Sequence, residues 1–138
     1  ILVGSVDPLV ADQEANDGFR QSQPIKVPQT VDGLIHEKRN VDVYSFEIDS
    51  EQRVVIEVLA RRHGSALDSL LTLFDARGRI VAVNDDHDGS PDSRITSELS
   101  QGRYLISLQD AHDHGGAAHP YRLIVRPAST EPIKFEER

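Results

Sequence analysis

Oxygen-bearing side chains gather near the amino terminus of the chain. Four of them lie within six positions, at Asp12, Glu14, Asn16 and Asp17. In a solvated turn, Asn16 or Asp17 would cap a single helical turn through its side-chain oxygen. Carboxylate and amide oxygens are also the ligands that calcium prefers. These residues therefore leave a capped turn and a cation site as alternatives.

A second acidic group lies in the middle of the chain and consists of Asp68, Asn84, Asp85, Asp86 and Asp88. Residues 69–74 and 80–83 are expected to pair as a hairpin. Asp68 directly precedes the first segment and Asp85 follows the second, so both residues fall at the open end of the hairpin. Carboxylates gathered there repel one another unless a cation or solvent separates them. A second calcium site and a solvated loop are the alternatives. The spacing differs from that of a helix-loop-helix calcium loop, which needs a Glu at position 12.

One loop is rich in histidine and contains Asp110, His112, His114 and His119. In extended backbone, His112 and His114 would point the same way. Imidazoles and a carboxylate can hold zinc or another transition metal. A small metal-dependent hydrolase that uses the three histidines is the less favoured hypothesis, and we favour an exposed loop between two strands.

No other arrangement has the spacing of a catalytic site. The serines lie in no nucleophile elbow, and Gly4, Gly18 and Gly33 lack the spacing of a phosphate-binding loop. Asp85 and Asp86 could exchange protons with a substrate, but a solvated loop is a poor place to tune a carboxyl group. The sequence therefore predicts a protein that is not an enzyme.

Apolar residues alternate with a period of two, which predicts half-buried strands. These strands would position the side chains described above. Tyr44, Phe46 and Ile48 share one face of their segment. The expected strands are residues 41–48, 53–60, 69–74, 80–83, 94–99, 103–109 and 121–125, with one or two more in 24–35, interrupted by Pro28. We expect residues 49–52 to join their neighbours as a hairpin. Residues 75–78 should form a turn that uses positive φ at Gly78.

About eight strands without a convincing helix predict an all-β fold, an antiparallel β-sandwich that buries the alternating faces of two sheets. Residues 12–127 would form this domain. Residues 1–11 would be a linker or an edge strand, and residues 128–138 a charged carboxy-terminal linker or tail.

The composition limits the partners. The 138 residues carry a net charge of −8, which argues against nucleic acid, whose phosphates need a basic face. No apolar run approaches the length of a membrane span. The chain has no Cys, begins at Ile1 and contains no Met, so we expect it to be a fragment or a processed product without disulfides.

Four short motifs, in this order and spacing, are similar to those of one bacterial family. They are Asp42-x-Tyr44-x-Phe46, Asp68-x-x-Leu71-x-Leu73-Phe74-Asp75-x-x-Gly78, Asn84-Asp85-Asp86 and Gly102-x-Tyr104-x-Ile106. Together they make residues 14–125 resemble the bacterial pre-peptidase C-terminal domain, to which the collagen-binding modules of clostridial collagenases are related.

The resemblance implies a jelly-roll-like β-sandwich appended to secreted bacterial enzymes, often peptidases. In such domains an amino-terminal acidic segment helps to hold a pair of calcium ions. Matched by motif, the implied ligands are Asp12, Glu14, Asn16 and Asp17, with Asp42 from the start of the following strand. Calcium is thus the expected cofactor.

The function expected from these observations is that of a calcium-stabilised accessory module of a larger secreted or cell-surface protein, extracellular or periplasmic. It would position or stabilise neighbouring domains of the same chain. The alternative is an adhesion module for matrix protein or polysaccharide. The aromatic side chains argue against collagen binding, because Tyr44, Phe46, Tyr104 and Tyr121 fall on inward faces and Phe74 is expected in the core.

Overall fold

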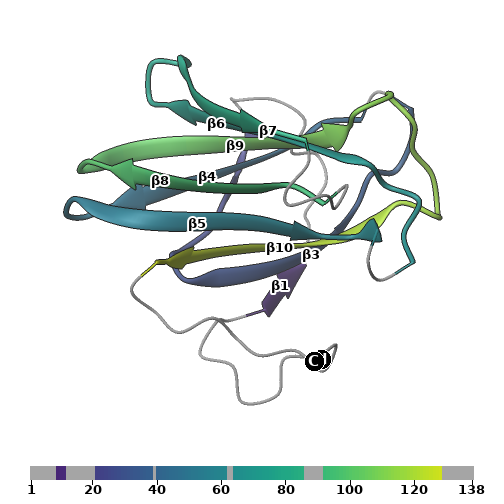
Figure 1. The fold of residues 1–138 in the computed structure, drawn as a ribbon, viewed down its shortest axis with the longest axis horizontal. Helices are drawn as coiled ribbons and strands as arrows, with labels where there is room; N and C mark the ends of the chain where they lie inside the picture. Colours follow the sequence, from purple (N-terminus) through teal and green to yellow (C-terminus); the bar gives the residue numbers. More distant parts are fainter. Residues whose placement is uncertain (1–8, 12–20, 39, 62–63, 86–91, 129–138) are drawn as a thin grey trace.

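The computed structural model of the chain describes residues 9–11, 21–38, 40–61, 64–85 and 92–128. These residues form ten β-strands and no α-helix (Figure 1), which confirms the expected all-β class. Within the same residues, no helix has the length and hydropathy of a transmembrane span.

The strands follow the alternation of apolar residues. They are β1 (Leu9–Ala11), β2 (Gln23–Pro24), β3 (Gln29–Leu34), β4 (Asp42–Ile48), β5 (Gln52–Leu59), β6 (Ser69–Asp75), β7 (Ile80–Asn84), β8 (Arg94–Leu99), β9 (Gly102–Asp110) and β10 (Pro120–Pro127). From β4 onwards, their bounds lie within two residues of the predicted ranges. The expected break at Pro28 separates β2 from β3.

The strands form two five-stranded sheets, which we call sheet A and sheet B. Sheet A has the order β1-β3-β10-β5-β8, and sheet B has the order β2-β4-β9-β6-β7. Neighbours are antiparallel except in the pairs β1–β3 and β2–β4. The predicted antiparallel β-sandwich is therefore confirmed, with parallel pairs confined to short edge strands.

The prediction of a hairpin at residues 49–52 is wrong. Strand β4 pairs with β9 in sheet B, whereas β5 pairs with β10 and β8 in sheet A, so this connection crosses from one sheet to the other. A short polar connection fits either arrangement, and alternation alone does not identify the pairing partner. The hairpin of β6 and β7 is confirmed, with a φ of 82° at Gly78.

The core lies between the sheets and is built from the predicted faces. Its largest fully buried side chains are Tyr44, Phe46, Ile35, Ile56, Leu67, Leu71, Leu73, Leu99, Ile106, Leu108, Leu123 and Val31. The rings of Phe46 and Tyr104 stack within this core, with centroids 5.8 Å apart. Phe74, expected in the core, is only half-buried, because it lies on the face of β6 opposite to Leu71 and Leu73.

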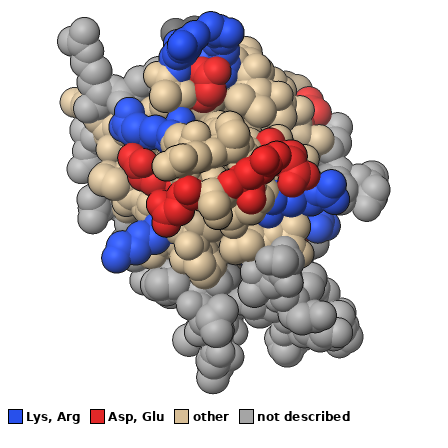
Figure 2. Space-filling view, turned by 90° about the vertical axis from the view of Figure 1, so that its left-hand side faces the viewer, with Lys and Arg blue, Asp and Glu red and all other residues tan. Residues whose placement is uncertain are grey.

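Strand register gathers many of the predicted site residues at one end of the sandwich. Strands β4 and β6 begin at this end, and β7 and β9 finish there, at the right of Figure 1. We call it the carboxylate end. Figure 2 shows the opposite end, where acidic and basic side chains are interspersed. Arg53 near the start of β5 and Glu98 near the end of β8 form an exposed pair with a closest N–O distance of 3.4 Å.

Candidate functional site at the carboxylate end

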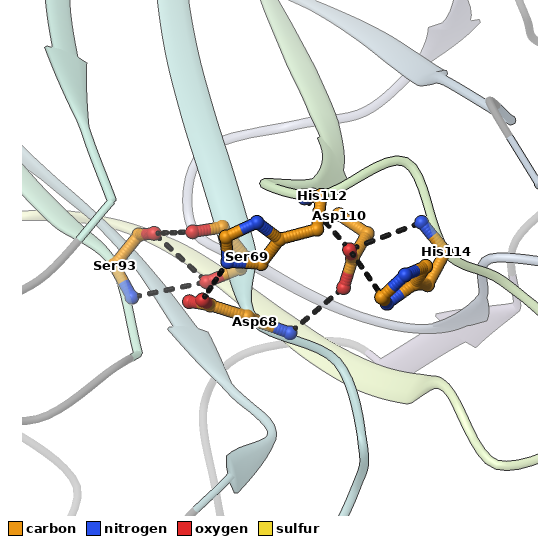
Figure 3. A network of polar contacts seen from close by, with 6 residues as sticks. All are labelled: Asp68, Ser69, Ser93, Asp110, His112 and His114. Carbon is orange, nitrogen blue, oxygen red and sulfur yellow. Dashed lines mark hydrogen bonds and ion pairs between the residues drawn. The ribbon is translucent and has the colours of Figure 1, made fainter.

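Asp110, the last residue of β9, organises the loop that follows it (Figure 3). One carboxylate oxygen accepts a hydrogen bond from the backbone N–H of Asp68 at 3.0 Å. The other accepts bonds from the N–H groups of His112 and His114, at 2.9 and 3.1 Å. The side chain is buried. A carboxylate that receives three backbone donors closes the loop much as an Asx turn does.

The pKa of Asp110 results from two opposing effects. Burial by itself raises the pKa, because it penalises the charged form. The backbone N–H groups of Asp68, His114 and His112, together with the charge of His114, outweigh burial and hold the pKa below its usual value. The hydrogen bonds of the folded loop therefore favour the ionised form of Asp110.

Two histidines of this loop lie beside acidic side chains. His112 Nε2 is 3.3 Å from an Asp68 carboxylate oxygen, and His114 Nδ1 is 3.8 Å from an Asp110 oxygen. The imidazole rings are exposed, and their centroids are 6.1 Å apart. Each imidazole thus faces a different carboxylate, and the two do not converge on one point in Figure 3.

The third histidine, His119, contributes to the loop through hydrogen bonds of its backbone groups. Its carbonyl oxygen accepts the N–H of Ile35, and its own N–H donates to Gly116. Its Nδ1 atom is buried without a hydrogen-bond partner. Among the described residues, no group of three or more His, Asp and Glu side chains is arranged to hold a metal ion. The hypothesis of a metal-dependent hydrolase therefore gains no support from this loop.

A pair of buried serines ties the two sheets together at this end. The Ser69 and Ser93 hydroxyl oxygens lie 2.8 Å apart, and the Ser93 hydroxyl oxygen lies 2.8 Å from the Ser69 carbonyl oxygen (Figure 3). Ser69 begins β6 in sheet B, while the Ser93 carbonyl accepts the N–H of Val58 in sheet A. The bonds of this serine pair therefore link the start of β6 in sheet B to the segment that is bonded to β5 in sheet A.

Asp42 is fully buried where β4 begins. One carboxylate oxygen accepts a hydrogen bond from the Tyr121 hydroxyl at 2.6 Å, and that hydroxyl lies 2.5 Å from the hydroxyl of Tyr44. A carboxylate withdrawn from water is costly unless bonds or a cation compensate it. Of the five ligands implied for the first calcium site, Asp42 is the one that the structure describes. Asp12, Glu14, Asn16 and Asp17 lie outside the described residues.

Two described members of the second acidic group have separate partners. Asn84 accepts the backbone N–H of Arg94 at 3.0 Å, and Asp68 faces His112. Asp85 follows β7 as an exposed residue at the open end of the hairpin, as expected. Asp86 and Asp88 lie outside the described residues, so calcium at this group stays a prediction.

Sequence reasoning missed two contributors to this end. Asp92 is buried, and its carboxylate accepts the backbone N–H groups of Ala60 at 3.2 Å and Arg61 at 2.8 Å, where β5 has just ended. Tyr121, read only as a core residue, also donates to Asp42. Polar residues next to predicted strand ends were the available signal, because backbone groups there need partners.

Two of the buried carboxylates at the carboxylate end are committed to backbone groups. Asp110 and Asp92 together receive five backbone N–H donors. This arrangement fixes loops and strand ends.

Comparison with known proteins finds one relative by sequence. No family model matches it. It is 32% identical over 117 residues to a Deinococcus radiodurans protein whose name is "Probable subtilase-type serine protease", a match that covers 81% of this chain. The chain spans only 16% of the length of that relative.

Solved structures share the fold at low sequence identity. The pre-peptidase C-terminal domain of a Bacillus anthracis collagenase superposes with a TM-score of 0.61 and 17% identity, covering 76% of this chain and 94% of that domain. PliG of Aeromonas hydrophila, a periplasmic inhibitor of g-type lysozyme, gives a TM-score of 0.58 and 15% identity, covering 88% and 98%. The resemblance seen in the sequence motifs is confirmed at the level of the fold: this chain is a β-sandwich of the pre-peptidase C-terminal domain type.

Proposed function

We propose that the chain is a non-catalytic member of the pre-peptidase C-terminal domain family, an accessory module of a larger secreted bacterial protein associated with a peptidase. The observation that carries the proposal is the 32% identity to a segment of a subtilase-type relative of which the chain spans 16%. A match confined to a small part of a long protein is what a separately folding module produces.

The bonding of the acidic and histidine side chains supports a role without catalysis. The buried carboxylates of Asp92 and Asp110 accept backbone N–H groups, and His112 and His114 are exposed in separate acid pairs. A catalytic base would need a polar group of the substrate within reach and a pKa near the working pH. The module would instead position or stabilise its neighbouring domains.

We also propose calcium as the ion that stabilises the fold. The supporting observation is a fully buried Asp42 carboxylate at the position that the family motif assigns to a ligand. Asp42 and the segment containing Asp12, Glu14, Asn16 and Asp17 would supply hard oxygen ligands. When bound, the ion would neutralise these carboxylates and stabilise the folded state because it binds that state alone.

The adhesion alternative lacks an aromatic surface in the described part of the chain. Tyr44, Phe46, Tyr104 and Tyr121 are buried, as expected. Phe74 is half-buried, while Phe19 and Phe135 lie outside the described residues. Binding surfaces for matrix protein or sugar usually depend on exposed aromatic anchors, so we rank this function second.

The experiment that tests the proposal is thermal unfolding of the 138-residue chain with calcium and with a chelator, together with a peptidase assay. At a calcium concentration about 100 times its dissociation constant, the stabilisation should be roughly 2.7 kcal/mol. We expect Asp17→Ala to abolish the calcium-dependent shift and Asp49→Ala, in an exposed loop, to leave it unchanged. We expect no peptidase activity in the chain alone.

Three outcomes are distinguishable. Loss of the shift in Asp86→Ala, with Asp17→Ala unaffected, would move the calcium site to the second acidic group. No shift in the unmodified chain would refute calcium while leaving the accessory role standing. Peptidase activity of the chain alone, abolished in His112→Ala, would refute the accessory role itself.

A further inference from the structure

The outer face of sheet A, which points away from the core, carries buried side chains. Side chains alternate between the two faces of a strand. On β10, Leu123 and Val125 belong to the core, so Ile124 and Arg126 lie on the outer face. They are nevertheless only 3% and 6% exposed. An arginine on an open sheet face would keep its charged head in water, so these side chains have a cover.

Strand register extends this buried surface to both neighbouring strands. Val55 on β5 lies opposite Arg126 and is 3% exposed. Thr30 on β3 lies opposite Ile124 and is 0% exposed. The hydroxyl oxygen of Thr30 is buried and has no hydrogen-bond partner within the described residues. We call Thr30, Val55, Ile124 and Arg126 the covered patch.

The described strands do not supply the cover. All ten belong to the two sheets, and sheet B packs on the inner face of sheet A. The cover is also local. Thr96 on β8, opposite Val55, is exposed, and Arg122, on the same face of β10 as Arg126, is part-exposed. The cover must therefore lie over β3, β10 and β5, towards the end of the sandwich where β10 finishes.

Residues 129–138, which lie outside the described residues, follow directly from this end of β10. The N–H of Ala128 donates to the Arg53 carbonyl, so the segment begins beside β5 and close to the covered patch. Ten extended residues span up to about 33–36 Å, whereas a strand of the length of β10 measures roughly 27 Å. The segment is therefore long enough to fold back over the strand that it leaves.

The sequence of residues 129–138 is complementary to the covered patch. In an extended backbone, Glu131, Ile133 and Phe135 point to the same side. Ile133 and Phe135 would meet the aliphatic part of the patch. Glu131, the first of the three along the segment, would bring a negative charge to Arg126, and a buried guanidinium needs such a partner.

The other segments outside the described residues fit the patch less well. Residues 1–8 contain one acid, Asp7, and lead into β1, which is two strands away from β10. Residues 12–20 connect β1 in sheet A to β2 in sheet B. Residues 62–63 and 86–91 follow β5 and β7, which finish at the carboxylate end.

We propose that residues 129–138 fold back over the covered patch, with Glu131 beside Arg126 and with Ile133 and Phe135 on the aliphatic part of the patch. This part of the outer face of sheet A is then an internal surface of the chain, and the segment is part of the domain in place of the linker or tail expected from the sequence. The proposal does not rest on the accessory role or on calcium.

Because the chain has no cysteine, the labelling of a single introduced thiol tests the cover directly. Thr30→Cys places the thiol within the covered patch, and Thr96→Cys places it on the exposed part of the same face. A thiol beneath a packed segment reacts only when that segment opens, so dithionitrobenzoate should label Thr30→Cys at least about tenfold more slowly than Thr96→Cys. Both variants are made in the 138-residue chain.

Substitutions within residues 129–138 identify the segment that forms the cover. In the Thr30→Cys chain, Ile133→Asp combined with Phe135→Asp should raise the labelling rate to within about threefold of that of Thr96→Cys, because burying the new carboxylates is costly and the segment opens. Circular dichroism of each variant verifies the fold.

A charge reversal tests the orientation of the segment. In the Thr30→Cys chain, Glu131→Lys places a second cation beside Arg126 and should also raise the labelling rate. Glu136→Lys is the matched control, because an extended backbone points this side chain to the opposite side, and it should leave the rate unchanged. This pair keeps the test decisive if the double Asp variant does not fold.

Three results would overturn the proposal. The first is equal labelling of Thr30→Cys and Thr96→Cys in the folded chain, which would mean that the face is open. The second is protection of Thr30→Cys that neither the double Asp variant nor Glu131→Lys reduces. The third is protection that Val3→Asp removes while the variants of residues 129–138 keep it, which would identify residues 1–8 as the cover.

Discussion

The Tyr121 hydroxyl lies 2.6 Å from a carboxylate oxygen of Asp42, and both groups are buried. Tyr121 is in β10 of sheet A, and Asp42 begins β4 of sheet B, so this bond crosses the core. The Tyr44 hydroxyl, 2.5 Å from that of Tyr121, extends the chain of bonds. Because Tyr121 donates to the carboxylate, its oxygen is left to accept from Tyr44.

Tyr121→Phe should destabilise the fold. The change removes the donor to Asp42 and the acceptor for Tyr44 and leaves both groups buried. We expect the free energy of unfolding to fall by about 1–3 kcal/mol, measured by urea denaturation. Tyr104→Phe is the control, because its hydroxyl donates to the Ser100 carbonyl in a part-buried position, and it should cost about 0.5–1.5 kcal/mol. Equal losses in the two variants would contradict a special role for Tyr121.

Gly33→Ala should also destabilise the fold, because Gly33 is registered opposite Tyr121 and a Cβ atom there would overlap the phenol ring. The ring is buried and has little room to move. We expect a loss of about 1–3 kcal/mol in unfolding free energy, as for other overpacked cores.

A double-mutant cycle with Tyr121→Leu tests this cause. If the clash with the ring explains the loss, Gly33→Ala should cost clearly less when Leu replaces Tyr121. An unchanged cost would mean that the backbone of β3, not the ring, resists the new side chain.

Local patterns were enough to predict the strands and their buried faces. Tyr44, Phe46 and Ile48 alternate with polar residues, and all three are buried as predicted. Alternation reports which face is buried, but it does not name the partner strand. The pattern therefore predicts a hairpin at residues 49–52, whereas β4 and β5 belong to different sheets.

The candidate site was harder to predict, because its bonds join residues that are far apart in sequence. Asp42 and Tyr121 are separated by 79 positions, and Asp110 reaches the N–H of Asp68 across 42. An Asp in a loop carries the same local signature whether it binds a cation or backbone N–H groups. Only the fold reveals that Asp110 accepts three backbone donors.

His112→Ala and His114→Ala should change stability little. Their side chains are 68% and 66% exposed, and exposed ion pairs contribute little in water. We expect each substitution to alter the free energy of unfolding by less than about 0.5 kcal/mol. Measuring unfolding with and without zinc extends the test: a zinc-dependent stabilisation that disappears in both variants would revive the metal hypothesis for this loop.

Asp110 should make the fold sensitive to acid. Its pKa in the folded chain is held below the usual value, against burial, by the N–H groups of Asp68, His114 and His112. The ionised form is thus favoured by folding, and its stabilisation is fully present above the unfolded pKa of about 3.9. As the pH falls from about 5 through that value towards the lower folded pKa, protonation of the unfolded chain removes the stabilisation.

Asp110→Asn tests this sign. An amide can still accept from the Asp68 N–H, but its NH₂ group cannot accept from His112 and His114, so we expect a loss of about 1–3 kcal/mol at pH 7. The difference between the unmodified chain and Asp110→Asn should then shrink as the pH falls below about 4. Asp113→Asn, in the same loop at a φ of 61° that Asn tolerates, is the control and should match the unmodified chain. Urea unfolding at several pH values gives the free energy of unfolding for the unmodified chain and both variants. If the difference between the unmodified chain and Asp110→Asn stays constant with pH, Asp110 stabilises the fold through its hydrogen-bond geometry and not through its charge.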